Sequence, residues 1–199
     1  MVESNLENIA KNYAKMSDAD IVRIATKEAT GLRPEVFGII ENEIKKRNLN
    51  QDLFRGVLAQ NKKYTVQEIE EYANLISELP CPICGSLDQK LNGTLSHTVK
   101  SMVFVTTSKT ELTIACPDCL DKKNDQAIKT SALLGWWGIP WGIIKTPLAI
   151  FRNEKAKKQN RMEFLNTALM SFTIANIGQI ETYKNDKQEL LKIITPKKY

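Results

Sequence analysis

Two short cysteine pairs constrain this chain more than any other feature. Each pair has the form Cys-Pro-x-Cys: the first holds Cys81 and Cys84, the second holds Cys116 and Cys119, and residues 85–115 separate them. Two soft thiolates in a tight turn can reach one ion at about 2.3 Å, so two such pairs predict a single tetrahedral site. Because all four ligands are cysteines, no coordination position is left for water, and we expect one structural Zn2+ rather than a catalytic metal.

The segment between the pairs has the composition of a β-hairpin. Residues 99–107 and 111–115 are rich in β-branched and aromatic side chains, which predicts two strands joined by a turn at residues 107–110. Asn92-Gly93 predicts a further turn. With Gly85 after the first pair, the four cysteines resemble a zinc ribbon over residues 81–120. The spacing is wider than in common zinc ribbons, so the insert is expected to add a strand or a loop. Zinc ribbons occur in RNA polymerase factors, ribosomal proteins and adaptor proteins, so the resemblance does not select a function.

The expected cellular compartment favours metal binding by the four cysteines over disulfide formation. Residues 1–7 show no basic or apolar pattern of a secretory signal, and we expect a cytoplasmic chain. Paired cysteines in a reducing compartment are metal ligands or redox thiols. A thiol oxidoreductase using Cys81 and Cys84 is an alternative, although it would need only one pair. The one histidine, His97, leaves little scope for hydrolytic chemistry, so we expect no enzyme and interpret His97 as a surface or hairpin residue.

Helices are predicted on both sides of the cysteine segment. Capping boxes at Ser17-x-x-Asp20 and Thr65-x-x-Glu68 begin two helices, and Pro34 suits the first turn of another. Apolar residues recur at helical spacing from 162 to 194, with an interruption at 176–178. We therefore predict an α+β protein with a helical module over 1–79, a zinc ribbon over 80–125, and a Trp-rich apolar hairpin with helices over 126–199.

Residues 131–151 form the most apolar stretch. No charge occurs from 131 to 144, Lys145 then interrupts, and all three tryptophans lie at positions 136, 137 and 141. Pro140, Pro147 and three glycines disfavour a straight spanning helix. Basic flanks on both sides place both ends at the cytoplasmic face, which fits a re-entrant or interfacial hairpin bent at 138–140. There are two alternatives: the segment is buried as a core hairpin, or it is a hot spot for binding another protein.

The order of these features carries a second resemblance. A four-cysteine ribbon followed by Gly135-Trp136-Trp137-Gly138-Ile139-Pro140-Trp141-Gly142 and then Thr146-Pro147 is similar to bacterial zinc-ribbon proteins of uncharacterised function with a hydrophobic C-terminal segment. The resemblance covers residues 81–151. It implies zinc binding and no particular activity.

The basic residues are concentrated late in the chain. The chain holds 28 Lys and Arg against 23 Asp and Glu, a net charge of +5, which is modest for a nucleic-acid-binding protein. Candidate basic-patch residues are Lys122, Lys123, Lys129, Arg152, Lys155, Lys157, Lys158 and Arg161. A nucleic-acid-binding zinc ribbon using this patch is an alternative, weakened because no aromatic side chain is interleaved with residues 152–161. Phosphate-cradling glycine loops are absent from the sequence, so we expect no nucleotide ligand.

These features predict a non-enzymatic, zinc-binding adaptor or interaction protein. We expect residues 131–151 to associate with the cytoplasmic face of a membrane, peripherally or as a re-entrant segment, or to bind an unidentified protein partner. The contact residues would be Trp136, Trp137, Pro140, Trp141 and Lys145.

Overall fold

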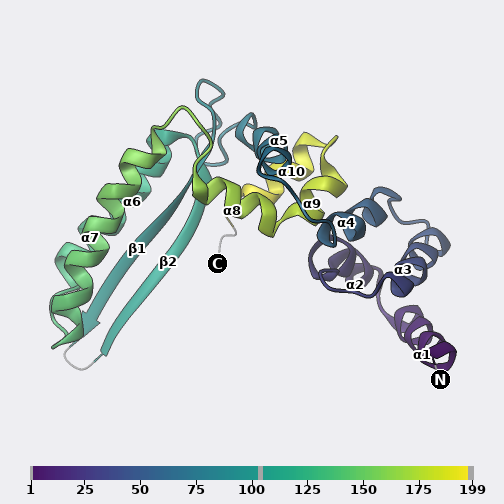
Figure 1. Cartoon of the computed structure of the whole chain (residues 1–199). Coiled ribbons are helices and arrows are strands. Elements are labelled where there is room, and N and C mark those ends of the chain that lie inside the picture. The colour runs from purple at the N-terminus through teal and green to yellow at the C-terminus, as the bar shows by residue number, and fades with distance from the viewer. Residues whose placement is uncertain (1, 103–104, 197–199) are drawn as a thin grey trace. The chain divides into compact units, whose positions relative to one another are not determined.

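The computed structural model describes residues 2–102 and 105–196 and confirms the predicted α+β class (Figure 1). Helices occupy both ends of the chain, and the middle forms a two-stranded antiparallel hairpin. The chain divides into two compact units. Within the described residues, unit 1 comprises 2–72 and 173–193, and unit 2 comprises 73–172 apart from 103–104, together with 194–196.

Unit 1 is helical, and local sequence signals set several of its helix ends. The side chain of Ser17 accepts a hydrogen bond from the Asp20 N–H and completes the predicted capping box. Thr65 and Glu68 form the second predicted box at the start of α5, and Pro34 opens α3 as predicted. Unit 1 contains the helices α1 (Val2–Lys15), α2 (Asp18–Arg23), the π-helix η1 (Ile24–Glu28), α3 (Pro34–Lys46), α4 (Asp52–Gln60), α5 (Val66–Ser77), α9 (Ile177–Tyr183) and α10 (Lys187–Ile194). The C-terminal ends of α5 and α10 belong to unit 2.

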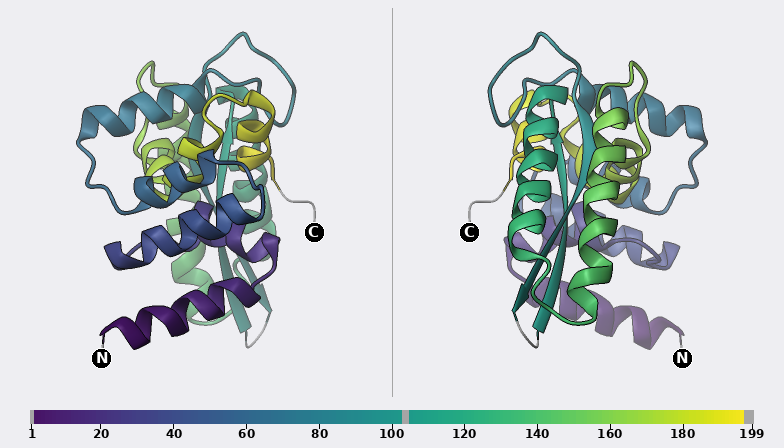
Figure 2. Two further views of the ribbon diagram at one scale, coloured as in Figure 1. Left: turned by 90° about the vertical axis from the view of Figure 1, so that its right-hand side faces the viewer. Right: turned by 90° about the vertical axis from the view of Figure 1, so that its left-hand side faces the viewer.

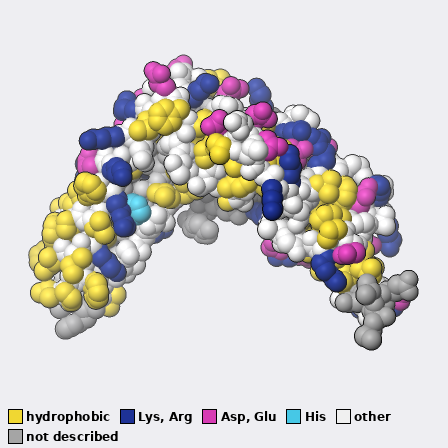
Figure 3. Space-filling model, in the orientation of Figure 1, with side chains coloured by type: hydrophobic (Ala, Val, Ile, Leu, Met, Phe, Trp, Pro, Cys, Tyr) yellow, Lys and Arg dark blue, Asp and Glu magenta, His cyan; other side chains and the backbone are white. Residues whose placement is uncertain are grey.

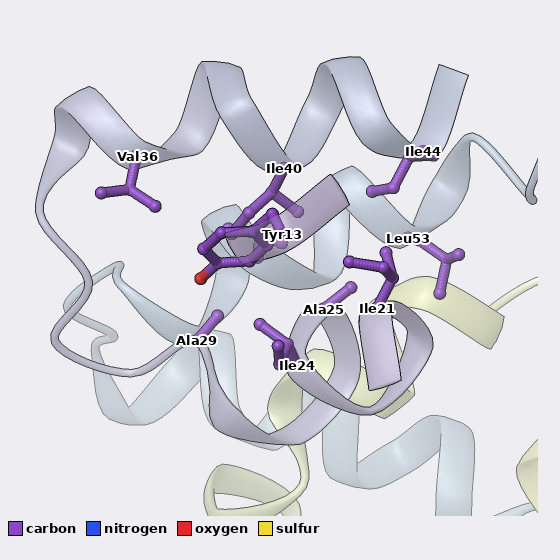
Figure 4. Packing of buried hydrophobic residues seen from close by; sticks show 10 residues of the cluster. Tyr13, Ile21, Ile24, Ala25, Ala29, Val36, Ile40, Ile44 and Leu53 are labelled. Atoms are coloured by element: carbon purple, nitrogen blue, oxygen red, sulfur yellow. The ribbon is translucent and has the colours of Figure 1, made fainter. Parts of the chain in front are cut away.

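Aliphatic side chains from α2, η1, α3 and α4 form the core of unit 1 (Figure 4). Ile21, Ile40 and Ile44 are fully buried within it. Glycine allows α4 and α9 to pack closely beside this core. A Cβ atom on Gly56 would lie 2.7 Å from the Gly178 carbonyl oxygen and 2.8 Å from that of Ala25. Position 56 therefore tolerates no side chain without backbone movement.

Unit 2 is a long β-hairpin flanked by two helices (Figure 2). Strand β1 (Asn92–Met102) pairs with β2 (Val105–Ala115) in a register that sets Asn92 opposite Ala115 and Met102 opposite Val105. Helices α6 (Pro117–Leu134) and α7 (Trp141–Asn160) run along the hairpin and pack mainly on β1. Helix α8 (Thr167–Ala175) follows α7 and begins in this unit.

Side chains from α7 and α6 take the place of a neighbouring strand along the outer edge of β1. The Asn153 amide accepts a hydrogen bond from the His97 N–H at 2.9 Å and donates one to the His97 carbonyl at 2.7 Å. Ser131 accepts from the Val99 N–H. Asn153 also accepts from Asn124, and both asparagines are fully buried. The interface between the helices and β1 is therefore fixed by hydrogen bonds as well as by apolar contacts.

Two turn predictions were wrong. Residues 107–110 lie inside β2, because the strand pairing extends further than the sequence indicated and continues to Met102 opposite Val105. Their side chains are exposed and pair across the hairpin, a setting that suits threonine, serine and lysine without any turn. Asn92-Gly93 begins β1 instead of forming a turn. The glycine is needed there because a Cβ would lie 2.7 Å from the backbone nitrogen of Leu169.

We predict opposite effects for two Gly→Ala substitutions in unit 1. Gly56→Ala should destabilise the chain by about 1–3 kcal/mol, because the methyl group would overlap two backbone carbonyls. Gly38→Ala lies in an exposed helix position with nothing within 4 Å of the new Cβ, and it should stabilise by about 0.5–1 kcal/mol. Urea unfolding midpoints measure both. Equal effects would contradict the close packing of α4 against α9.

Asn153→Leu should lower the free energy of unfolding by about 2–4 kcal/mol, since both His97 backbone groups and the Asn124 amide lose a buried partner. Gln159→Leu, on the exposed side of the same helix, is the matched control and should change stability by less than about 0.5 kcal/mol. Urea titration of both variants tests this role of Asn153. A loss no larger than that of the control would contradict it.

Candidate metal centre and apolar tip

The first cysteine pair lies in a tight turn ahead of β1. The Gly85 N–H donates to the Cys81 carbonyl at 2.8 Å, and the Cys81 N–H donates to the Ser86 carbonyl at 2.9 Å. Gly85 has a φ of +76°, a left-handed conformation that glycine adopts without strain. This turn brings Cys81 and Cys84 to the same side of the loop as the second pair.

The second pair lies where β2 ends and α6 begins. Cys116 is the N-cap residue of α6, Pro117 occupies its first turn, and Cys119 follows within that turn. Exposed N–H groups and the helix dipole favour negative charge at this end of a helix. The Cys116 N–H also points to the Cys81 sulfur at 3.4 Å. The two pairs are thus joined by a backbone hydrogen bond to sulfur.

The structure brings the four predicted cysteines together. Their sulfur atoms all lie within 4.8 Å of one another. The Sγ atoms of Cys84 and Cys116 are 3.7 Å apart, and four ligands at about 2.3 Å from a tetrahedral ion stand roughly 3.8 Å from one another. Cys84 is exposed and the other three are buried, and none of the four forms a disulfide. Donor type, number and spacing all fit a metal ion.

The surroundings favour ionisation of Cys81 over that of Cys116 and Cys119. Burial opposes ionisation of Cys81, but hydrogen bonds from the backbone of Cys116, Cys84 and Ile83 outweigh it and lower its pKa to about 7. Burial raises the pKa of Cys116. The pKa of Cys119 is raised by burial and then by its hydrogen bonds to neighbouring cysteines. A divalent cation at the centre would stabilise all four thiolates together.

His97 lies in β1, outside this cluster. Its Nδ1 atom is 2.9 Å from the Thr110 hydroxyl. Burial, and then the positive charge of Arg152, lower its pKa. Its position in the hairpin agrees with the interpretation drawn from the sequence.

Exposed apolar side chains gather at the end of unit 2 that holds the loop between α6 and α7 and the pair of Met102 and Val105 (Figure 3). The exposed fraction reaches 79% for Ile139, 72% for Leu133 and 68% for Trp137. We call this surface the apolar tip. Its members are Met102, Val105, Leu133, Leu134, Trp136, Trp137, Ile139, Trp141, Ile143, Ile144, Leu148 and Phe151.

The interior of the apolar tip is made of small and polar residues. A Cβ on Gly135 would lie 2.2 Å from the Thr146 hydroxyl oxygen, and one on Gly138 would lie 2.3 Å from that of Thr106. The Ser101 hydroxyl donates to the Gly135 carbonyl at 2.7 Å. No space is left inside for large side chains. The predicted bend at 138–140 is confirmed, since the loop between α6 and α7 spans 135–140.

The predicted contact residues all belong to this loop or to the first turns of α7. Trp136 and Trp137 donate their indole N–H groups to the carbonyls of Ala132 and Leu133. Pro140 is the N-cap residue of α7 and Trp141 its first residue. The Lys145 ammonium lies 5.6 Å from the Trp141 ring centre. Met102 and Val105 join the apolar tip from the hairpin, and sequence reasoning missed them because it placed the turn at 107–110.

The predicted basic patch is divided between two helices and partly neutralised. Lys157 pairs with Asp125 at 2.8 Å. Arg161 pairs with Asp121 at 2.8 Å and with Asp118 at 3.0 Å. Among the described residues, no ion pair involves the remaining patch members, which are Lys122, Lys123 and Lys129 on α6 and Arg152, Lys155 and Lys158 on α7.

Comparison with protein-family models, with curated proteins and with solved structures found no match for this chain. Within residues 2–102 and 105–196, every helix is too short or too polar to cross a membrane.

We predict that the purified chain binds one metal ion through the four cysteines. Cys84→Ser should release the metal and unfold the base of the hairpin. Cys84→His should retain one ion, because imidazole replaces thiolate in Cys3His zinc sites and this position is exposed. Elemental analysis gives the metal content, and a thiol reagent gives the number of free cysteines. A metal-free parent protein with four reactive thiols would contradict the metal centre.

Proposed function

We propose that this chain is a non-enzymatic zinc-binding protein whose apolar tip inserts into the interfacial zone of a membrane. Zinc is the proposed metal because four thiolates in a tetrahedron match its ligand preference and leave no open coordination position. The ion would hold the cysteine loop against the start of α6. Its role would be structural, and the apolar tip would supply the binding function.

The observation that carries the membrane proposal is the reversed polarity of the apolar tip. Its large hydrophobic side chains face outward, while glycine, serine and threonine fill its interior. Small residues and internal hydrogen bonds are what hold helices together where the surroundings are apolar. The indole N–H groups of Trp136 and Trp137 are already bonded to backbone carbonyls. Their rings can therefore enter an apolar phase without leaving a donor unpaired.

Charge around the apolar tip supports the cytoplasmic face as the proposed location. Lys145 lies beside the Trp141 ring, and Lys129 and Arg152 follow on the two helices close to the exposed apolar residues. Tryptophan rings with adjacent lysines suit the headgroup level of anionic membranes. Zinc binding requires reduced cysteines, and the cytoplasm keeps cysteines reduced. The nucleic-acid alternative is less favoured, because acidic residues neutralise Lys157 and Arg161.

Flotation with lipid vesicles tests the proposal. The parent chain should float with the vesicles, and a Leu133→Ser/Trp137→Ser double variant should bind at least tenfold more weakly. An aromatic side chain buries about 150–250 Å2, so Trp137, which is 68% exposed, has at least roughly 100 Å2 left to bury. At about 25 cal/mol per Å2 this is worth roughly 2.5 kcal/mol.

The matched control is Leu87→Ser/Phe164→Ser. It removes two exposed apolar side chains from unit 2 that lie outside the apolar tip. It should float as the parent does. A parent chain that stays with the unbound protein and remains monodisperse would show that the membrane proposal is wrong.

A further inference from the structure

One face of the β-hairpin forms a polar groove with α6. Ser96, Thr98 and Lys100 share this face of β1, and their partners across the hairpin are Glu111, Lys109 and Thr107. Together with Lys123, Gln126 and Thr130 of α6 they line a groove of about 390 Å3. The groove lies entirely within unit 2.

The groove carries a surplus of positive charge. Its lining holds three lysines and one carboxylate. Lys109 pairs with Glu111 at 3.1 Å, which leaves Lys100 and Lys123 without an ion pair in the part of the chain that the structure describes. Thr98 and Thr107 line the same groove: Thr98 precedes Lys100 by two residues on β1, and Thr107 is the partner of Lys100 across the hairpin. Ammonium and hydroxyl donors around one cavity are suited to a phosphate oxygen.

The groove opens directly behind the apolar tip. Lys100 precedes Met102 by two residues of β1, which corresponds to roughly 7 Å along a strand. Thr130 precedes Leu133 by three residues of α6, or roughly 4.5 Å along a helix. An interfacial segment buries its apolar face about 5–10 Å into the boundary between headgroups and acyl chains. With the apolar tip inserted, this end of the groove stands at the level of the headgroups.

We infer that this groove binds the phosphate-bearing headgroup of an anionic phospholipid. The inference rests on the proposed insertion of the apolar tip, and it adds lipid selectivity to that function. Lys100 and Lys123 supply the charge that distinguishes an anionic from a zwitterionic headgroup. Thr98 and Thr107 donate hydrogen bonds to phosphate oxygens.

Vesicle binding of the full chain tests the inference with two lipid compositions. One set contains phosphatidylcholine alone, and the other contains phosphatidylcholine with phosphatidylglycerol. A lysine near an anionic surface contributes about fivefold in affinity, so two contribute roughly 25-fold. Lys100→Gln/Lys123→Gln should lose at least tenfold on the anionic vesicles and keep the parent affinity for the neutral ones.

The control, Lys90→Gln/Lys158→Gln, removes the same charge from exposed positions of unit 2 outside the groove. It should weaken binding less than about threefold, because charges more than about 10 Å apart are largely screened at an ionic strength of about 0.1 M, at which the vesicles are compared. An equal loss in both double variants would mean unspecific attraction and would overturn the inference.

The remaining outcomes separate this inference from the proposed function. A parent chain that binds both vesicle types equally would retain tip insertion and overturn the groove assignment alone. A parent chain that binds neither would overturn both. If added inorganic phosphate, at constant ionic strength, abolished the preference of the chain for anionic over neutral vesicles, the groove would be assigned to a free anion instead. Tighter binding of a single-stranded oligonucleotide, with the same dependence on Lys100 and Lys123, would overturn the lipid assignment.

Discussion

The convergence of four sulfur atoms is the constraint on which unit 2 depends. Cys81 and Cys84 belong to a loop, and Cys116 and Cys119 belong to the start of α6, with the whole β-hairpin between them. Four thiolates this close repel one another unless a cation compensates their charge. A structural zinc ion supplies about 10–16 kcal/mol of apparent binding free energy, comparable to the whole folding free energy of a domain. Metal occupancy would therefore decide whether the hairpin and α6 meet at all.

The interior of unit 2 explains why its surface is so apolar at one end. Asn124, Asn153, Ser131 and Thr146 are fully buried between the helices and β1. Glycine occupies the positions where the chain reverses between α6 and α7, since Cβ atoms there would overlap their neighbours. With the interior filled by small and polar groups, the tryptophans and aliphatic side chains of this segment have only the outside to occupy. The exposed apolar surface thus follows from the packing of the unit.

Local signals in the sequence were sufficient for some features and misleading for others. The capping boxes at Ser17 and Thr65 act within a few residues, and the cysteine spacing reports directly on ligand geometry, so all three were predictable. Asn92-Gly93 has the sequence of a turn, but Gly93 is required because the backbone at Leu169, more than 70 residues away in the chain, packs closely against it. Likewise, Asn153 supports the edge of β1 from another element. Contacts between residues that are far apart in the chain leave no signal in a local sequence pattern.

The metal centre and the apolar tip lie at opposite ends of one hairpin. The cysteines adjoin the pair formed by Asn92 and Ala115, whereas Met102 and Val105 belong to the apolar tip. Ten intervals at about 3.4 Å separate Asn92 from Met102 by roughly 34 Å. A metal ion at one end cannot touch whatever binds at the other. A metal ion held there would act on the apolar tip only by keeping both strands in register and α6 in place, so its loss would abolish the proposed binding through unfolding and not through a local change in affinity.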